Sequence, residues 1–218
     1  LWGVYVWLLQ RNVNPSLVFV GSFVALIGAG TVALKLPAST PPEHPITWVD
    51  AMFTSTSAAC VTGLIVRDTP HEFTRFGHFV IMGLFQLGGL GVILFGSMVA
   101  LLLGSSISLK AVHAMTDSTQ HGAASVPSVR RLVIFAAATV FGLELMGASM
   151  LYFGWPSAAE WANAPVGLDS PLDRAFHALF FSISAFCNAG FATTSDSLES
   201  IQVHWTTHIV IGGLIVVG

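Results

Sequence analysis

The stretch Ser57-Ala58-Ala59-Cys60-Val61-Thr62-Gly63-Leu64 decides the fold of this chain. It returns 127 residues later as Ser184-Ala185-Phe186-Cys187-Asn188-Ala189-Gly190-Phe191. The 13-residue window 51–63 holds seven identities at this constant offset. The identical pairs are Ala51/Ala178, Phe53/Phe180, Ser55/Ser182, Ser57/Ser184, Ala58/Ala185, Cys60/Cys187 and Gly63/Gly190. So many identities in so short a window exceed what chance provides, and the sequence therefore predicts an internal duplication.

The composition is that of an integral membrane protein. Of the 218 residues, 54% are hydrophobic and 9% are charged, and the mean hydropathy is +0.76. Soluble domains carry about a quarter charged residues, so this chain has too little polar surface to cover a soluble globule. The net charge of −3 and the lack of a basic tract argue against nucleic acid as a partner. We therefore expect the lipid bilayer as the surroundings of the chain.

Three apolar stretches are long enough to cross a bilayer, namely 16–36, 73–103 and 132–153. A fourth apolar run begins near Trp205 and continues to the last residue. The second stretch contains several glycines, which predicts a close helix contact or a kink at 88–91.

Two shorter helices are predicted immediately before the repeated stretches. Thr47 to Asp50 and Ser170 to Asp173 both have the pattern of a capping box, a hydroxyl followed by an acid three residues later. The first helix would reach Ala58 or Ala59 after about three turns, and the second would be about one turn longer. Neither can cross a membrane, so each is expected to enter part-way, turn and leave by the same side.

The predicted fold class is therefore an all-α integral membrane protein with repeated units of span, pore helix, re-entrant filter loop and span. Residues 1–12 would end an N-terminal helix and 13–103 would form the first unit. Residues 104–131 would form a polar connector, which the resemblance described below implies to be cytoplasmic, and 132–218 the second unit with its last span incomplete. Because the chain starts and stops within apolar runs, we expect it to belong to a longer polypeptide.

Backbone carbonyls at the two repeated stretches have the chemistry to bind a monovalent cation. Non-helical backbone at membrane depth is tolerated where it is buried in protein or lines a water-filled path. Carbonyl oxygens can replace the hydration shell of an ion without a fixed charge that would trap it. Gly63 and Gly190 permit the required positive φ. A structural alternative stays open: the two glycines would only end re-entrant helices in a protein that transports something other than a cation.

The residues also resemble a known family. Residues 50–64, followed by Asp68-Thr69 and by 86–91, resemble the first repeat of the Trk/Ktr/HKT superfamily of potassium transporters, in particular its Ktr-type membrane subunit. Residues 176–191 with Ser195-Asp196 resemble the second repeat, and 143–148 resemble the helix before it. The chain departs from the family because it holds two of the four repeats.

The resemblance implies potassium uptake through a central pore in a bacterial plasma (inner) membrane, with a homodimer resting on a cytosolic nucleotide-binding ring of the RCK/KTN type. The implied transported ion is potassium. By the same resemblance, a glycine at position 63 favours potassium over sodium. Whether sodium is coupled to the uptake stays open. The implied filter carbonyls are those of Cys60, Val61, Thr62, Gly63, Cys187, Asn188, Ala189 and Gly190.

Three acids are weaker site candidates. Asp68 and Asp196 follow the two repeated stretches and would concentrate cations at the pore mouth, or simply cap and solvate a loop. Glu144 lies in mid-span, where an acid marks an ion pathway or a bond between helices. We favour a structural hydrogen bond between the repeats over direct contact with the ion, although no partner is visible in the sequence. A non-conducting structural subunit is the alternative function. An intramembrane enzyme ranks third, because we find no motif for catalysis.

Overall fold

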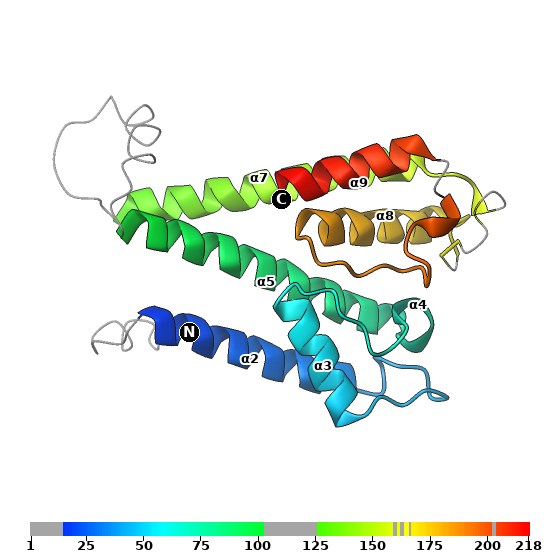
Figure 1. Cartoon of the computed structure of the whole chain (residues 1–218), viewed down its shortest axis with the longest axis horizontal. Coiled ribbons are helices and arrows are strands. Elements are labelled where there is room, and N and C mark those ends of the chain that lie inside the picture. Colours follow the sequence, from blue (N-terminus) through cyan, green and yellow to red (C-terminus); the bar gives the residue numbers. More distant parts are fainter. Residues whose placement is uncertain (1–14, 103–125, 159–160, 162–163, 166, 202–203) are drawn as a thin grey trace.

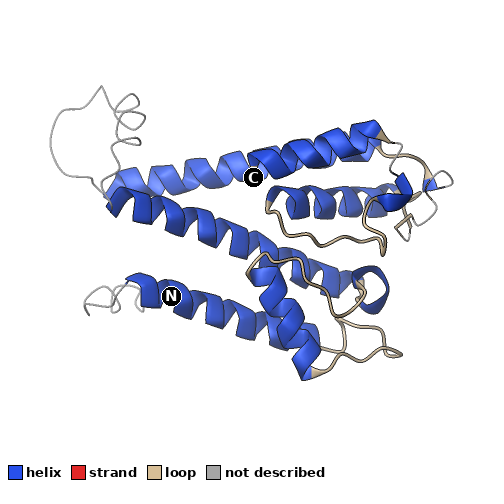
Figure 2. Ribbon diagram, in the orientation of Figure 1, coloured by secondary structure: helices blue, strands red, loops and turns tan. Residues whose placement is uncertain are grey.

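The computed structural model describes residues 15–102, 126–158, 161, 164–165, 167–201 and 204–218. Every regular element in these residues is a helix (Figure 2), which confirms the all-α prediction for the described part of the chain. The predicted segment 1–12 and most of the predicted connector 104–131 lie outside the described residues.

Four apolar helices frame the fold: the long helices α2 (Pro15–Lys35), α5 (Arg75–Leu102) and α7 (Val126–Gly154), and the 13-residue helix α9 (Trp205–Val217). Within α2 and α7, the segments Leu17–Lys35 and Ile134–Gly154 are long and apolar enough to cross a membrane. Helix α5 has 28 residues, about 42 Å at the helical rise. Helix α7 begins at Val126, so the end of the predicted connector is helical.

The two predicted short helices are α3 (Trp48–Ala59) and α8 (Pro171–Phe186). They contain 12 and 16 residues, so the second is one turn longer, as the sequence predicts. The Thr47 hydroxyl accepts a hydrogen bond from the Asp50 amide at 3.1 Å, which confirms the first cap. The Ser170 side chain makes no such bond. The predicted side-chain cap at Ser170 was therefore wrong. Pro171 at the first helical position already supplies the helical φ.

The helices α3 and α8 each pack between two of these four apolar helices. Helix α3 contacts α2 and α5, whereas α8 contacts α7 and α9. The two three-helix groups meet where α5 packs on α8. Figure 1 shows that the loop after α3 and the loop after α8 both run back toward the end of the molecule at which α4 (Thr69–Glu72) and η2 (Glu199–Ile201) lie.

The same serine bond fixes each short helix to the long helix before it. Ser55 Oγ donates to the Ile27 carbonyl at 2.8 Å, and Ser182 Oγ donates to the Glu144 carbonyl at 2.6 Å. One turn further along each long helix, Gly30 and Gly147 face these serine hydroxyls so closely that a methyl group would not fit. Small residues therefore let the helices approach until a side-chain hydroxyl reaches a backbone carbonyl.

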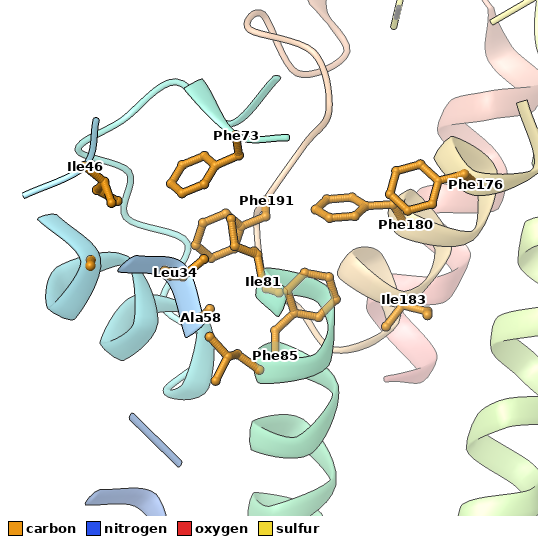
Figure 3. Packing of buried hydrophobic residues seen from close by; sticks show 13 residues of the cluster. Leu34, Ile46, Ala58, Phe73, Ile81, Phe85, Phe176, Phe180, Ile183 and Phe191 are labelled. Atoms are coloured by element: carbon orange, nitrogen blue, oxygen red, sulfur yellow. The ribbon is translucent and has the colours of Figure 1, made fainter. Parts of the chain in front are cut away.

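Aromatic side chains fill the space between the two groups. The Phe85 ring of α5 lies 5.5 Å from the Phe180 ring of α8 and 6.2 Å from the Phe191 ring, which follows the second repeated stretch. All three are almost fully buried, and Figure 3 shows them converging with Ile81 and Leu34. This core holds the loop after α8 against α5.

Candidate functional site

The repeated stretches fold into two turns with the same hydrogen bonds. Both begin at a cysteine that caps a short helix, and three successive amides point back to the last helical turn. In the first turn the bonds are Cys60 N to Thr56 O (2.9 Å), Val61 N to Ala58 O (3.1 Å) and Thr62 N to Ser57 O (2.9 Å). In the second they are Cys187 N to Ile183 O (2.9 Å), Asn188 N to Ala185 O (3.1 Å) and Ala189 N to Ser184 O (2.8 Å).

The backbone of both turns is left-handed at matching positions. Val61 and Asn188 have φ of 56° and 57°, and Gly63 and Gly190 both have φ of 72°. A β-branched residue such as Val61 is rarely found there. The geometry repeats in two different local sequences, so the surrounding fold holds it in place.

A serine hydroxyl braces each turn from inside. Ser57 Oγ donates to the Leu64 carbonyl at 2.7 Å, and Ser184 Oγ donates to the Phe191 carbonyl at 2.6 Å. Both serines are buried. The brace joins the last turn of each short helix to the residue after the glycine, and so fixes the exit path of the chain.

The two turns touch each other at their glycines. A methyl group on Gly63 would lie 2.8 Å from the Ala189 carbonyl oxygen and 3.2 Å from the Gly190 Cα. The backbone of one turn is therefore in contact with the backbone of the other, and the two repeated stretches form one site.

The eight predicted carbonyl residues are all present at this site. Among the described residues, the backbone–backbone hydrogen bonds outside the helices do not use the carbonyl oxygens of Cys60–Gly63 or of Cys187–Gly190. Ala189 is fully buried, whereas Thr62 and Asn188 are exposed. A row of carbonyls that the fold leaves uncommitted fits the chemistry of cation coordination. Whether these oxygens hold an ion stays a prediction.

A glycine of α5 and the glycine that caps the C-terminal end of α9 set how closely each of these helices approaches a turn. Gly88 of α5 lies against the Ala59 carbonyl, and Gly218 lies against the Phe186 carbonyl, with no room for a methyl group in either case. Ala59 and Phe186 are the last residues of α3 and α8. This is the close contact predicted at 88–91, and α5 continues as a helix through it.

The two weaker acids beyond the turns differ in their surroundings. The Asp68 carboxylate accepts a hydrogen bond from Ser195 Oγ and lies beside His71 Nδ1, each at 2.7 Å. It thus joins the first exit loop to the second, and its side chain makes no cap bond to α4. Asp196 is half-buried in a loop whose Glu199 amide donates to its carbonyl at 3.0 Å.

A second group of charges surrounds the start of α3. Arg67 donates to Asp50 at 2.8 Å and to Glu72 at 3.1 Å. The hydrogen bond from Arg67, assisted by that with Thr47, holds the pKa of Asp50 below its ordinary value of 3.8. A lowered carboxyl pKa stabilises the folded state above that ordinary value, and the stabilisation is lost as the pH falls through the lowered pKa.

Arg67→Gln is expected to lower the melting temperature of the purified protein at neutral pH. The loss should shrink as the pH falls from the ordinary pKa of 3.8 through the lowered pKa of Asp50, because the carboxyl then becomes protonated in the wild-type protein as well. Thermal unfolding in detergent over a series of pH values measures this. A difference between the two proteins that stays constant down to strongly acid pH would contradict the role given to the ion pair.

Glu144 has a partner that the sequence analysis missed. Gln86 Nε2 donates to both carboxylate oxygens, at 2.9 Å and 3.1 Å. This bond agrees with the interpretation of Glu144 as a hydrogen-bonding residue between the repeats, although no partner was visible in the sequence. The two residues lie 58 positions apart on α5 and α7, beyond the reach of any local pattern. The available signal was an amide within the apolar helix 76–92.

The comparisons with known proteins agree with one another. Residues 10–218 match TrkH, described as a cation transport protein. The chain is 37% identical over 212 residues to Ktr system potassium uptake protein B of Bacillus subtilis (strain 168), covering 95% of this chain and 43% of that protein. It is 34% identical over 197 residues to the protein of the same name from Vibrio alginolyticus, covering 90% and 40%.

A third relative has a broader name. The chain is 28% identical over 213 residues to potassium/sodium uptake protein NtpJ of Enterococcus hirae, covering 96% of this chain and 44% of that protein. The chain therefore spans less than half the length of these curated relatives.

Proposed function

Because this chain belongs to the TrkH family of cation transport proteins, we propose that it forms part of the pore of a potassium uptake protein. The family is one of transporters and not of enzymes. This excludes the intramembrane enzyme that the sequence analysis ranked third. The substrate is proposed from the names of the relatives, which are potassium or potassium/sodium uptake proteins.

The observation that carries the proposal is the matched geometry of the two turns. Their equal φ values and their uncommitted carbonyls support a filter formed by Cys60–Gly63 and Cys187–Gly190. Each short helix ends at its turn, so the negative end of its dipole lies at the place proposed for the cation. A dehydrated potassium ion is stabilised by such carbonyls and dipoles together.

The arrangement in the bilayer follows from the same elements. We propose that α2, α5, α7 and α9 belong to membrane-spanning helices of a multi-pass protein in a bacterial plasma membrane. The apolar surfaces of α2 and α7 support this. Two units of span, pore helix, filter loop and span would supply two parts of a filter that the whole protein completes.

Partners come from the system to which the relatives belong. The name "Ktr system potassium uptake protein B", which two of the relatives carry, describes a component of a system. We propose that the whole protein is a homodimer and that it binds a cytosolic nucleotide-binding ring of the RCK/KTN type. Potassium is the proposed transported ion, with sodium as a second candidate because one relative is named for both.

Influx into cells tests the function. The full open reading frame, expressed in a strain that lacks potassium uptake, is expected to restore growth at low potassium and to take up rubidium. Cells with the empty vector provide the background. No uptake above that background, with the protein present in the membrane by immunoblot, would contradict the proposal and favour a non-conducting structural subunit.

A further inference from the structure

We propose that Gln86 and Glu144 form a tie that positions the second filter turn against the first and thereby sets cation selectivity. The inference rests on the proposed function. Neither residue is among the proposed filter residues, so both act as positioning residues. Glu144 is 1% exposed and Gln86 is 9% exposed, so the carboxylate and the amide meet away from solvent.

The tie is an addition to the framework that the two units share. Ile27 and Glu144 occupy equivalent places, because the carbonyl of each accepts the serine hydroxyl of the next short helix. On the long helix, that bond uses only the backbone carbonyl and needs no particular side chain at 27 or 144. The first unit has an isoleucine there and the second a glutamate. The Glu144 carboxylate is therefore not needed to hold α7 to α8. Because a buried carboxylate costs free energy unless it is paired, we look for its role in its contact with Gln86.

The partner of Glu144 connects the carboxylate to the beginning of the second turn. Gln86 Oε1 lies 3.9 Å from Cys187 Sγ, within reach of a weak thiol hydrogen bond. One turn along α5, a methyl group on Gly89 would lie 3.0 Å from the same sulfur. Cys187 caps α8 and is the first residue of the second turn. The tie thus joins α7, α5 and the second turn.

Helix α5 also contacts the end of α3, where the first turn begins. Gly88, the neighbour of Gly89, lies against the carbonyl of Ala59, the last residue of α3. Gln86, Gly88 and Gly89 therefore place the ends of both short helices against one rigid helix. A displacement of α8 relative to α5 would move the Ala189 carbonyl away from Gly63, since these two stretches are in contact.

Two double variants of the full-length protein, compared with a matched control, separate positioning from folding. A single change such as Gln86→Leu leaves a buried carboxylate without its partner and is expected to fold poorly. The double variant Gln86→Leu/Glu144→Met removes both polar groups at similar volume, which is often tolerated. The exchange Gln86→Glu/Glu144→Gln keeps one amide and one carboxylate in contact. Ile27→Leu, at the equivalent place without a tie, is the matched control.

The readouts are rubidium influx in cells, its KM and maximal rate, and its inhibition by sodium. In the double variant we expect the preference for rubidium over sodium to fall about tenfold, which corresponds to about 1.4 kcal/mol in relative cation binding. The maximal rate per membrane-inserted protein should change far less. The exchanged pair should recover most of the selectivity, and Ile27→Leu should behave as the wild type.

The outcomes distinguish a failure of the Gln86–Glu144 proposal from a failure of the proposed potassium-uptake function. An unchanged selectivity in a well-expressed double variant would overturn the tie and leave the potassium-uptake function standing. The same holds if the exchanged pair is well expressed yet recovers no selectivity. If the wild-type protein itself takes up no rubidium, the proposed function fails, and the tie as a determinant of selectivity fails with it.

Discussion

Replacing Gly63 with serine is expected to reduce potassium influx at least about tenfold and to weaken the preference for potassium over sodium. Gly63 has φ of 72°, where a residue with a Cβ costs about 1–2 kcal/mol, or roughly one order of magnitude in an equilibrium. The new Cβ would also lie 2.8 Å from the Ala189 carbonyl oxygen, so a proposed filter carbonyl would have to move. Gly190→Ser should act in the same direction, because its φ is also 72°.

Rubidium influx at matched membrane expression measures both variants. Gly21→Ser on α2 is the control, because a Cβ there meets nothing within 4 Å among the described residues and its φ is ordinary. Wild-type influx and wild-type inhibition by sodium in both filter variants would remove the two glycines from the ion path.

Replacing Gly88 with alanine is expected to lower the stability of the protein. The added methyl group would overlap the Ala59 carbonyl oxygen. Both partners are backbone or attached directly to it, so no flexible side chain can yield. Overpacking of this kind costs about 1–3 kcal/mol, and here the strain falls directly on the start of the first turn.

Gly83→Ala is the matched control on the same helix. It should be neutral or slightly stabilising, since a Cβ at Gly83 meets no atom within 4 Å in the described structure and alanine favours a helix by up to about 1 kcal/mol. Thermal melting of the purified full-length proteins in detergent, together with rubidium influx, compares the two. Equal melting temperatures for Gly88→Ala and Gly83→Ala would contradict the contact with α3.

Local chemistry explains what could be predicted from the sequence. The hydroxyl at Thr47 and the proline at 171 mark where the short helices begin, and the shared glycines mark where their turns end. The one-turn difference between α3 and α8 follows from those marks alone. The apolar length of 16–36 likewise agrees with α2 to within one residue at each end.

Contacts between distant parts of the chain explain what could not be predicted. The partner of Glu144 is on another long helix, and no helical or strand periodicity relates the two positions. The serine braces at Ser57 and Ser184 depend on the turn geometry itself, which no residue pattern displays. The interaction of Arg75 with Asp173, which joins α5 to α8, likewise exists only once the two helix groups have packed.

Ion flux into liposomes tests the central claim most directly, because the liposome membrane contains no other transporter. The complete protein, purified and reconstituted with potassium inside the vesicles, is expected to accumulate radioactive rubidium down the resulting electrical gradient. External potassium should compete with rubidium more strongly than sodium does, and Gly63→Ser should reduce the accumulation. Vesicles that hold correctly folded protein but take up rubidium no faster than protein-free vesicles would contradict the claim that these turns line a cation pathway.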